Sequence, residues 1–200
     1  AGIDKLDLIG FDACLMGTFE VALAMAEHAD VMVASQELEP GHGWDWQALE
    51  ILASDSSIEA QSLGLAIANY YEQHAVDNGT ETEITLSVLD LTLVSEVNEA
   101  LRALEIPLVT ESDSLAAKLG SAQSTSLRLG KNPDPSIDAQ MIDLGNLATE
   151  LGKLEPGLLE LTTNLVNAID EMVIGSAANA PTISNSGLCG ANPSDDAGYF

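Results

Sequence analysis

The sequence has 200 residues, 46% of them hydrophobic and 19% charged, which is typical of one globular domain with a sizeable core. It carries 32 acidic and 6 basic residues, and the formal net charge of −26 disfavours nucleic acid and anionic membranes as partners. The same charge favours cations and basic peptides, and it suits salty surroundings, where counter-ions screen repulsion. No apolar run has the length of a membrane span, and no signal peptide is visible.

Strands and helices alternate along the first half of the chain. A buried strand is expected in KLDLIGFDAC (residues 5–14), a helix in TFEVALAMAEHAD (18–30) with Thr18 as N-cap, and a second strand in VMVAS (31–35). A longer helix is expected over residues 58–76, with Ile58, Leu65 and Tyr70 among its apolar residues. The alternating pattern of EITLSVLDL (83–91) predicts a third strand.

The second half of the chain is mainly helical in its pattern. A helix over residues 94–104 is expected to be disrupted by Pro107, and two more helices are expected over 137–154 and 156–175. Residues 110–135 and 180–200 are expected to be rich in loops. The alternation predicts an α/β domain with a parallel sheet flanked by helices, in which functional groups gather at the carboxyl ends of strands.

Cys14 stands at such a strand end, shortly before a helix. Backbone N–H groups at a helix start favour an anion and could stabilise a thiolate, although a free cysteine is often only a small buried residue. Asp12 lies on the same face of the strand as Cys14, because strand side chains alternate. A carboxylate there either caps a neighbouring loop or faces a pocket that admits a cation.

The segment GFDACLMGTFEVALAMAEHADVMVASQELEPGHGWDW (residues 10–46) resembles the core of the clostripain-like cysteine peptidases, members of the caspase-like clan. The resemblance rests on the Asp-Ala-Cys-Leu-Met-Gly block, the helix after it, the Val-Ala-Ser strand end and Glu-Pro-Gly-x-Gly-Trp. MIDLGNLATEL (141–151) is a weaker match, and the tail departs from the family pattern. The resemblance implies a caspase-like three-layer sandwich with a mostly parallel sheet and helices on both faces.

The resemblance also implies roles for individual residues. Cys14 matches the nucleophile that forms a thioester acyl-enzyme, and Asp12 matches the acidic residue of the primary specificity pocket, which suits Arg or Lys. Trp44 and Asp45 are expected to contact the substrate, as is Ser35 at the neighbouring strand end. Because the loop aligns only to within a few residues, Glu39 or His42 could form the pocket wall instead. Carboxylates select a guanidinium by charge-assisted pairing, in agreement with this reading.

One departure from the family bears on activity. The general-base histidine of the family lies upstream of the cysteine, and neither His28, His42 nor His74 matches it; His42 is the one candidate substitute. The chain is therefore expected to be the C-terminal part of a peptidase domain, without its N-terminal strands and histidine segment, and inactive alone. It would act with the N-terminal segment of the same enzyme. The alternative is a catalytically silent module that binds basic peptides or a protein partner.

Three further expectations concern cofactors, location and the second cysteine. The chemistry needs no cofactor, although Ca²⁺ could bind the acidic stretches DNGTETE (77–83) and NPSDD (192–196), which otherwise read as solvated turns. The family resemblance implies a secreted or cell-surface bacterial protein. Cys189 could form a bridge with Cys14, and the sequence alone assigns it no role.

Overall fold

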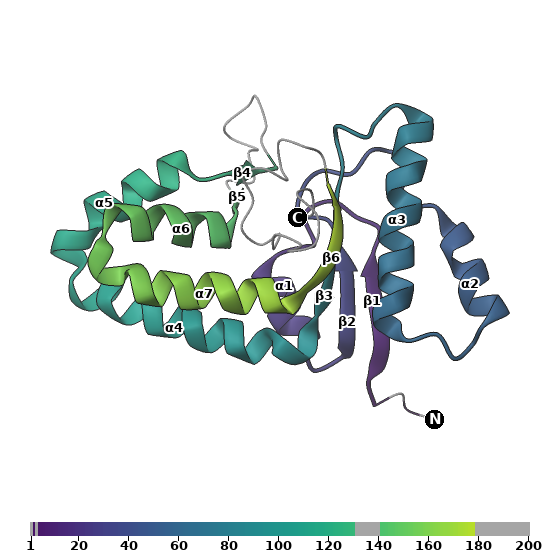
Figure 1. Ribbon diagram of the computed structural model, residues 1–200, viewed down its shortest axis with the longest axis horizontal. Coiled ribbons are helices and arrows are strands. Elements are labelled where there is room, and N and C mark those ends of the chain that lie inside the picture. Colours follow the sequence, from purple (N-terminus) through teal and green to yellow (C-terminus); the bar gives the residue numbers. More distant parts are fainter. Residues whose placement is uncertain (1, 3, 131–140, 179–200) are drawn as a thin grey trace.

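A computed structural model describes residue 2 and residues 4–130 and 141–178. Four strands form the central sheet in the order β1-β2-β3-β6, and two short strands pair separately as β4-β5. Figure 1 shows α2 and α3 on one side of this sheet and the helices α4 to α7 on the other. The α/β class, with helices on both faces of the sheet, is therefore confirmed.

The elements follow one another with short connections. The first half contains β1 Leu6–Phe11, α1 Phe19–Met25, β2 Ala29–Ala34, the 3-10 turn η1 Trp46–Ala48, α2 Leu49–Ser54, α3 Ala60–Asn78, β3 Thr85–Asp90 and η2 Leu91–Leu93. The second half contains α4 Val94–Thr110, α5 Ser112–Thr125, β4 Arg128–Leu129, β5 Met141–Ile142, α6 Leu144–Leu154, η3 Pro156–Leu158, α7 Leu159–Met172 and β6 Val173–Ala178.

The sheet is mixed in the described residues, where the sequence predicts a mostly parallel one. β1 pairs with β2 in parallel, whereas β2 with β3 and β3 with β6 are antiparallel. The reason lies in the connection between β2 and β3, which contains two helices instead of one. His42, shortly after β2, contacts Thr80, shortly after α3, so the chain enters β3 at the end of the sheet where it left β2.

The two faces of the sheet carry separate apolar clusters, because neighbouring residues of a strand point to opposite faces. Met32 and Leu89 pack with Leu165 and other residues of the α4–α7 layer. Val33 and Val88 lie in the cluster of the other face, with residues of α3. Burial on both faces explains why residues 31–34 of β2 form a continuous apolar run.

Three differences from the expected elements have local causes. Pro107 does not end its helix: α4 continues to Thr110, since a proline near a helix end removes one hydrogen bond while packing against α7 is kept. Residues 112–125, expected to be loop-rich, form α5, which buries only Leu115 and Ala122 and so shows little apolar periodicity. The helix predicted over 156–175 ends at Met172 and turns directly into β6.

Candidate functional site

Cys14 lies just beyond the carboxyl end of β1, and its side chain is exposed. The neighbouring Asp12 is also exposed. Leu15 has φ +61°, a left-handed conformation that is uncommon for any residue except glycine and clusters at functional sites. The chain therefore turns sharply after Cys14 and leaves the thiol at the surface of the sheet edge.

The loop after β1 is bonded to the loop after β2. Gly17 donates its N–H to the Ser35 carbonyl at 2.7 Å, and Leu15 donates to the Glu37 carbonyl at 3.2 Å. A Cβ on Gly17 would lie 2.9 Å from the Ser35 backbone carbon, so no larger residue fits this approach without a shift. Because β1 and β2 are parallel, this bonding brings two strand ends together around Cys14.

Glu39 approaches Cys14 from the second loop. Its backbone N–H points at the Cys14 sulfur, with an N–Sγ distance of 3.2 Å, and its carboxylate accepts a hydrogen bond from the Trp44 indole at 3.1 Å. Burial and the nearby Asp12 carboxylate raise the pKa of Glu39 to about 7, although the Trp44 hydrogen bond lowers it. Two carboxyl groups thus lie together beside the thiol.

A glycine and a histidine hold the loop against Asp12. Gly43 has φ +67°, and a Cβ there would lie 2.9 Å from Asp12 Oδ2. His42 donates from Nδ1 to the Gly43 carbonyl at 2.7 Å, and its Nε2 hydrogen-bonds Thr80 Oγ1 at 2.8 Å. The loop is thereby fixed to the end of α3, and the missing side chain of Gly43 makes room for the Asp12 carboxylate.

Tyr71 of α3 lies under this loop and is fully buried. Its ring centroid is 6.2 Å from that of His42, and its hydroxyl has no hydrogen-bond partner among the described residues. Burial raises the pKa of Tyr71, and the negative charges of Glu39, Asp12 and Cys14 raise it further. We refer to Asp12, Cys14, Glu39 and Tyr71 as the Asp12 cluster.

Three residues expected at the site have structural contacts of their own. Ser35 is fully buried, and its hydroxyl bonds Thr85 Oγ1 at 2.8 Å and the Glu37 carbonyl. Asp45 caps η1 by accepting the Gln47 N–H at 2.9 Å. Trp44 is nearly buried and reaches the cluster through Glu39. The structure therefore brings Asp12, Cys14 and Trp44 together, and it places Asp45 and Ser35 in roles that hold the loop.

None of the three histidines, all of which lie in the described residues, is hydrogen-bonded to Cys14. His28 is exposed, and its carbonyl accepts the N–H of Leu6, at the opposite end of β1 from Cys14. Both ring nitrogens of His42 are engaged, as described above. His74 stacks edge-on against His42 with ring centroids 4.7 Å apart. The general base is therefore not supplied by any of these side chains in the arrangement observed.

Sequence reasoning named Glu39 only as an alternative and missed Tyr71. The expected helix over 58–76 was assigned Tyr70 as an apolar residue, whereas Tyr70 is 37% exposed and Tyr71 is the buried neighbour. The adjacent tyrosines are indistinguishable by residue type, and the weak amphipathic pattern of α3 does not say which one faces the sheet. Glu39 could have been found from its place between the strand end and Trp44.

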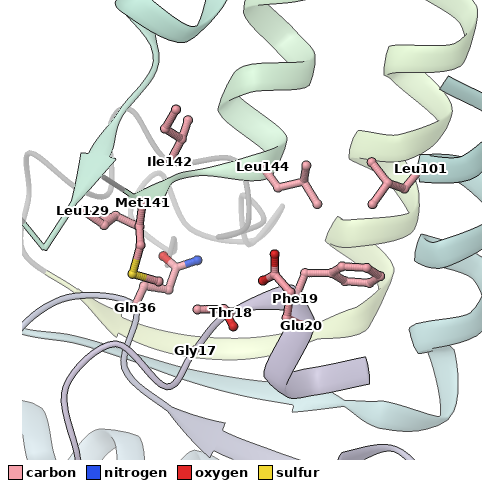
Figure 2. A pocket seen from close by; sticks show the side chains of 10 residues that line it. All are labelled: Gly17, Thr18, Phe19, Glu20, Gln36, Leu101, Leu129, Met141, Ile142 and Leu144. Carbon is pink, nitrogen blue, oxygen red and sulfur yellow. The ribbon is translucent and has the colours of Figure 1, made fainter. Parts of the chain in front are cut away.

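A separate pocket lies at the start of α1, beside the β4-β5 pair (Figure 2). Its volume is about 360 Å³, and it shares no residue with the Asp12 cluster. Apolar side chains from α4, α6 and the β4-β5 pair form most of its wall, together with the start of α1; its residues are Gly17, Thr18, Phe19, Glu20, Gln36, Leu101, Leu129, Met141, Ile142 and Leu144.

Solved structures with this fold are cysteine proteases. An inactive zymogen C11 protease from Parabacteroides distasonis has a TM-score of 0.65 at 20% identity, with 98% of this chain and 49% of that chain covered. A clostripain from Bacteroides thetaiotaomicron ATCC 29148 has a TM-score of 0.63 at 18% identity, with 86% of this chain and 67% of that chain covered. A secreted C11 cysteine protease from the same species, iotapain, has a TM-score of 0.61 at 17% identity, with 86% of this chain and 43% of that chain covered. The expected caspase-like fold is that of the C11 cysteine proteases.

The sequence defines the family more closely than these structures do. The model of the clostripain family matches residues 2–188, and this chain belongs to that family. The resemblance inferred from residues 10–46 is thereby confirmed. No curated protein sequence matches the chain significantly. The chain spans about half of the Parabacteroides distasonis protease and less of iotapain.

Proposed function

We propose that this chain carries the nucleophile and the primary specificity pocket of a cysteine endopeptidase that cleaves after arginine or lysine. The observation that carries the proposal is the exposed thiol of Cys14 at the carboxyl end of β1, beside the Asp12 and Glu39 carboxyl groups. A nucleophile next to two carboxyl groups matches a substrate whose basic side chain precedes the scissile bond.

The reaction follows from the position of the thiol. The general base takes the proton of the Cys14 thiol, and the thiolate attacks the peptide carbonyl carbon. The tetrahedral intermediate collapses to a thioester as the C–N bond breaks, and the amine leaves with the proton that the base returns. Water then attacks the thioester, which releases the acid and restores the thiol. The N–H of Glu39 at the sulfur stabilises the anionic form of the nucleophile before attack.

The general base is proposed to come from the N-terminal segment of the same enzyme. Among the described residues β1 pairs only with β2, so its other edge has no partner strand there. A strand that paired in parallel with this edge would end beside Cys14, because carboxyl ends of parallel strands meet at one side of a sheet. A histidine at that strand end would reach the thiol, and the chain without it would be inactive.

The substrate class has support from charge. Asp12 is exposed at the site and Glu39 adds a second carboxyl group, so the site attracts cations and repels acidic side chains. The solved clostripain of Bacteroides thetaiotaomicron is in complex with the peptide inhibitor BTN-VLTK-AOMK, whose peptide part ends in lysine. Peptides or proteins with basic residues are therefore the proposed substrates.

Location and cofactor use follow the family. Two of the similar solved structures are described as a secreted C11 protease of Bacteroides thetaiotaomicron, and we extend secretion or cell-surface display to this protein. In the described residues no helix is long and apolar enough to cross a bilayer. No group of three metal-ligating side chains occurs in them either, and the NPSDD stretch lies outside them, as does Cys189. The proposed thiol chemistry uses no cofactor, and a calcium requirement would show as activity lost with EGTA and restored by Ca²⁺.

The test uses the whole enzyme and peptides with Arg, Lys, Asp or Leu before the scissile bond. Cys14→Ala should reduce cleavage by a factor on the order of 10⁴ or more, while the matched Cys189→Ala leaves it unchanged. Asp12→Asn should lower kcat/KM for the Arg and Lys peptides about 10²–10³-fold, because a substrate cation then lacks its charged partner. Cleavage that survives Cys14→Ala, or equal turnover of Leu and Arg peptides, would refute the proposal.

A second candidate function has one observation in its favour. Because no histidine is bonded to Cys14 in the described residues, the chain could be a silent module that binds basic peptides. Such a module would bind an Arg peptide in an Asp12-dependent way and never cleave it. Turnover of the Arg peptide by the whole protein separates the two functions.

A further inference from the structure

The segment that follows β2 makes two separate contacts with the turn that carries Cys14. The Glu37 carbonyl accepts the N–H of Leu15 at 3.2 Å, and two residues later the Glu39 N–H points at Cys14 Sγ at 3.2 Å. Leu15 has φ +61°, an uncommon conformation that persists where the surrounding structure holds it. The position of the thiol therefore depends on the backbone of residues 37–39.

The carboxylate of Glu37 holds this backbone. Its Oε1 accepts the N–H of Leu38 at 2.8 Å and that of Gly130 at 2.8 Å. Gly130 follows β4, 93 residues further along the chain, so the second bond ties the segment to a distant element. The neighbours of these two residues, Gln36 and Leu129, both line the pocket of Figure 2, in agreement with this close approach.

The main chain of Glu37 is fixed by other contacts. Its N–H bonds Thr85 Oγ1 at 3.0 Å and Ser35 Oγ at 3.2 Å, and the Ser35 hydroxyl donates to the Glu37 carbonyl at 3.0 Å. These bonds fix residue 37 itself, but they do not set the direction in which the chain continues to residue 39. The carboxylate sets that direction, because it accepts the N–H of Leu38.

We propose that Glu37 is a positioning residue for the nucleophile, whose carboxylate holds residues 37–39 so that the Glu39 N–H stays on Cys14 Sγ. The inference rests on the proposed function, since it takes Cys14 as the nucleophile. A hydrogen bond to the sulfur stabilises the thiolate, which is the form that attacks a carbonyl carbon. Glu37 acts through the backbone, so its loss should change the reactivity of the thiol and leave substrate binding unchanged.

The test compares Glu37→Ala with Glu37→Gln in the whole enzyme. Both variants lose the negative charge, but the amide oxygen of glutamine still accepts the two N–H groups, whereas alanine accepts neither. We expect iodoacetamide to alkylate Cys14 about 5-fold more slowly at pH 7 in Glu37→Ala, as for one lost hydrogen bond to a charged group, and within about 2-fold of the unaltered rate in Glu37→Gln. Mass spectrometry of the Cys14 peptide measures the rate.

The effect of charge alone has the opposite sign. Loss of a neighbouring negative charge favours the thiolate, so it would speed alkylation in both variants. The other ionisable groups near the thiol, Asp12, Glu39 and Tyr71, are the same in every variant. If Glu37→Ala does not fold, Glu37→Asp keeps the charge on a side chain one methylene shorter, and it should slow alkylation about 2–3-fold.

Peptide cleavage gives a second measurement. In Glu37→Ala, kcat for an Arg peptide should fall about 10-fold while KM changes less than about 2-fold, and Glu37→Gln should restore kcat. Glu155→Ala is the matched control, because Glu155 also accepts a glycine N–H, from Gly157 at 3.1 Å, and is bonded to Lys118 of another helix, α5. It should lower the urea midpoint and leave both alkylation and kcat unchanged.

The remaining outcomes would contradict the inference. Unchanged or faster alkylation in Glu37→Ala would show that the carboxylate does not hold the Glu39 N–H on the sulfur. An equal fall in Glu37→Ala and Glu37→Gln would show that the two hydrogen bonds are not the cause, and a raised KM at constant kcat would place Glu37 in substrate binding. Alkylation needs no peptidase activity, so its result is separate from the Cys14→Ala cleavage test that decides the proposed function.

Discussion

The two sides of the central sheet differ in the types of side chain that they contain. The layer of α4, α5, α6 and α7 buries leucine, isoleucine and methionine with few polar atoms, and Leu165, Ile169 and Met172 are fully buried there. Beside α3, on the other side, two carboxyl groups and a thiol lie in the loops after β1 and β2, next to the phenol of Tyr71 in α3. The first region is arranged for stability, and the second places charges where burial costs free energy.

Because the two regions differ in this way, substitutions in one should affect stability and substitutions in the other should affect ligand recognition. Apolar burial is non-directional, so a defect in the helical layer lowers the free energy of unfolding without changing which ligand is bound. The Asp12 cluster is joined by directional contacts, including the Glu39–Cys14 and Trp44–Glu39 hydrogen bonds, so a defect there changes recognition. Changes in each region can test this separation.

The largest expected effect on stability comes from the helical layer. Leu165→Ala removes a fully buried side chain from the core and should lower the free energy of unfolding by about 2–5 kcal/mol. Urea denaturation of the whole enzyme measures this loss. The ratio of kcat/KM for Arg and Lys peptides, assayed well below the melting temperature, should stay the same. A changed ratio would show that the two regions are coupled.

The fold could be predicted largely from the sequence because periodicity reports burial. Residues 31–34 of β2 are apolar and buried as expected, and the Thr18 cap bonds the Val21 N–H at 3.2 Å, whereas no residue of β1 is fully buried. The direction of β3 could not be predicted, since it depends on whether one helix or two connect it to β2. The short β6 was hidden in a helical pattern because the chain passes from α7 to β6 without a turn residue.

The site could be predicted only where the residue type itself carries the chemistry. Cys14 and Asp12 stand close in sequence, so strand alternation alone places them together. Asp45 was favoured over Glu39 as the second acid, and both follow the same strand within one loop. The path of that loop decides between them: Gly43 with its positive φ turns the chain, which leaves Asp45 as a helix cap and brings Glu39 to the thiol.

A substitution at Gly43 should lower both the stability of the protein and its activity, each by an intermediate amount. Gly43→Ala places a side chain at φ +67° and its Cβ 2.9 Å from Asp12 Oδ2. The strain should cost about 1–3 kcal/mol of stability, and the displaced carboxylate should lower kcat/KM for Arg peptides about 10-fold. Gly79→Ala is the matched control, with φ +70° and no atom within 4 Å of its Cβ. It should show a similar loss of stability and no loss of activity.

Glu39 gives the smallest effect on stability and the clearest dependence on pH. Its pKa is raised to about 7, so the folded protein holds this proton more tightly than the unfolded chain. Stability from this group is therefore present below the ordinary pKa of 4.5 and is lost as pH rises through about 7. The full shift corresponds to roughly 3 kcal/mol, and solvent screening of this half-buried group reduces it to about 1–2 kcal/mol. Glu39→Gln should thus unfold at higher urea concentration at pH 8 and show little change at pH 4.

Activity should rise with pH over the range in which the stability contributed by Glu39 is lost. As Glu39 loses its proton, the Asp12 cluster gains a negative charge. We therefore expect kcat/KM for Arg peptides to rise as the pH increases through about 7. Glu39→Gln keeps the Trp44 contact through its amide oxygen and removes the charge, so this rise should be lost. Asp12 and Cys14 face Glu39 directly, with Tyr71, His42 and His74 behind the loop, so the shape of the remaining profile reports those groups. If Glu39→Gln is more stable at pH 8 and yet keeps the full rise in activity, Glu39 is buried near the site but does not interact with the charge of the substrate.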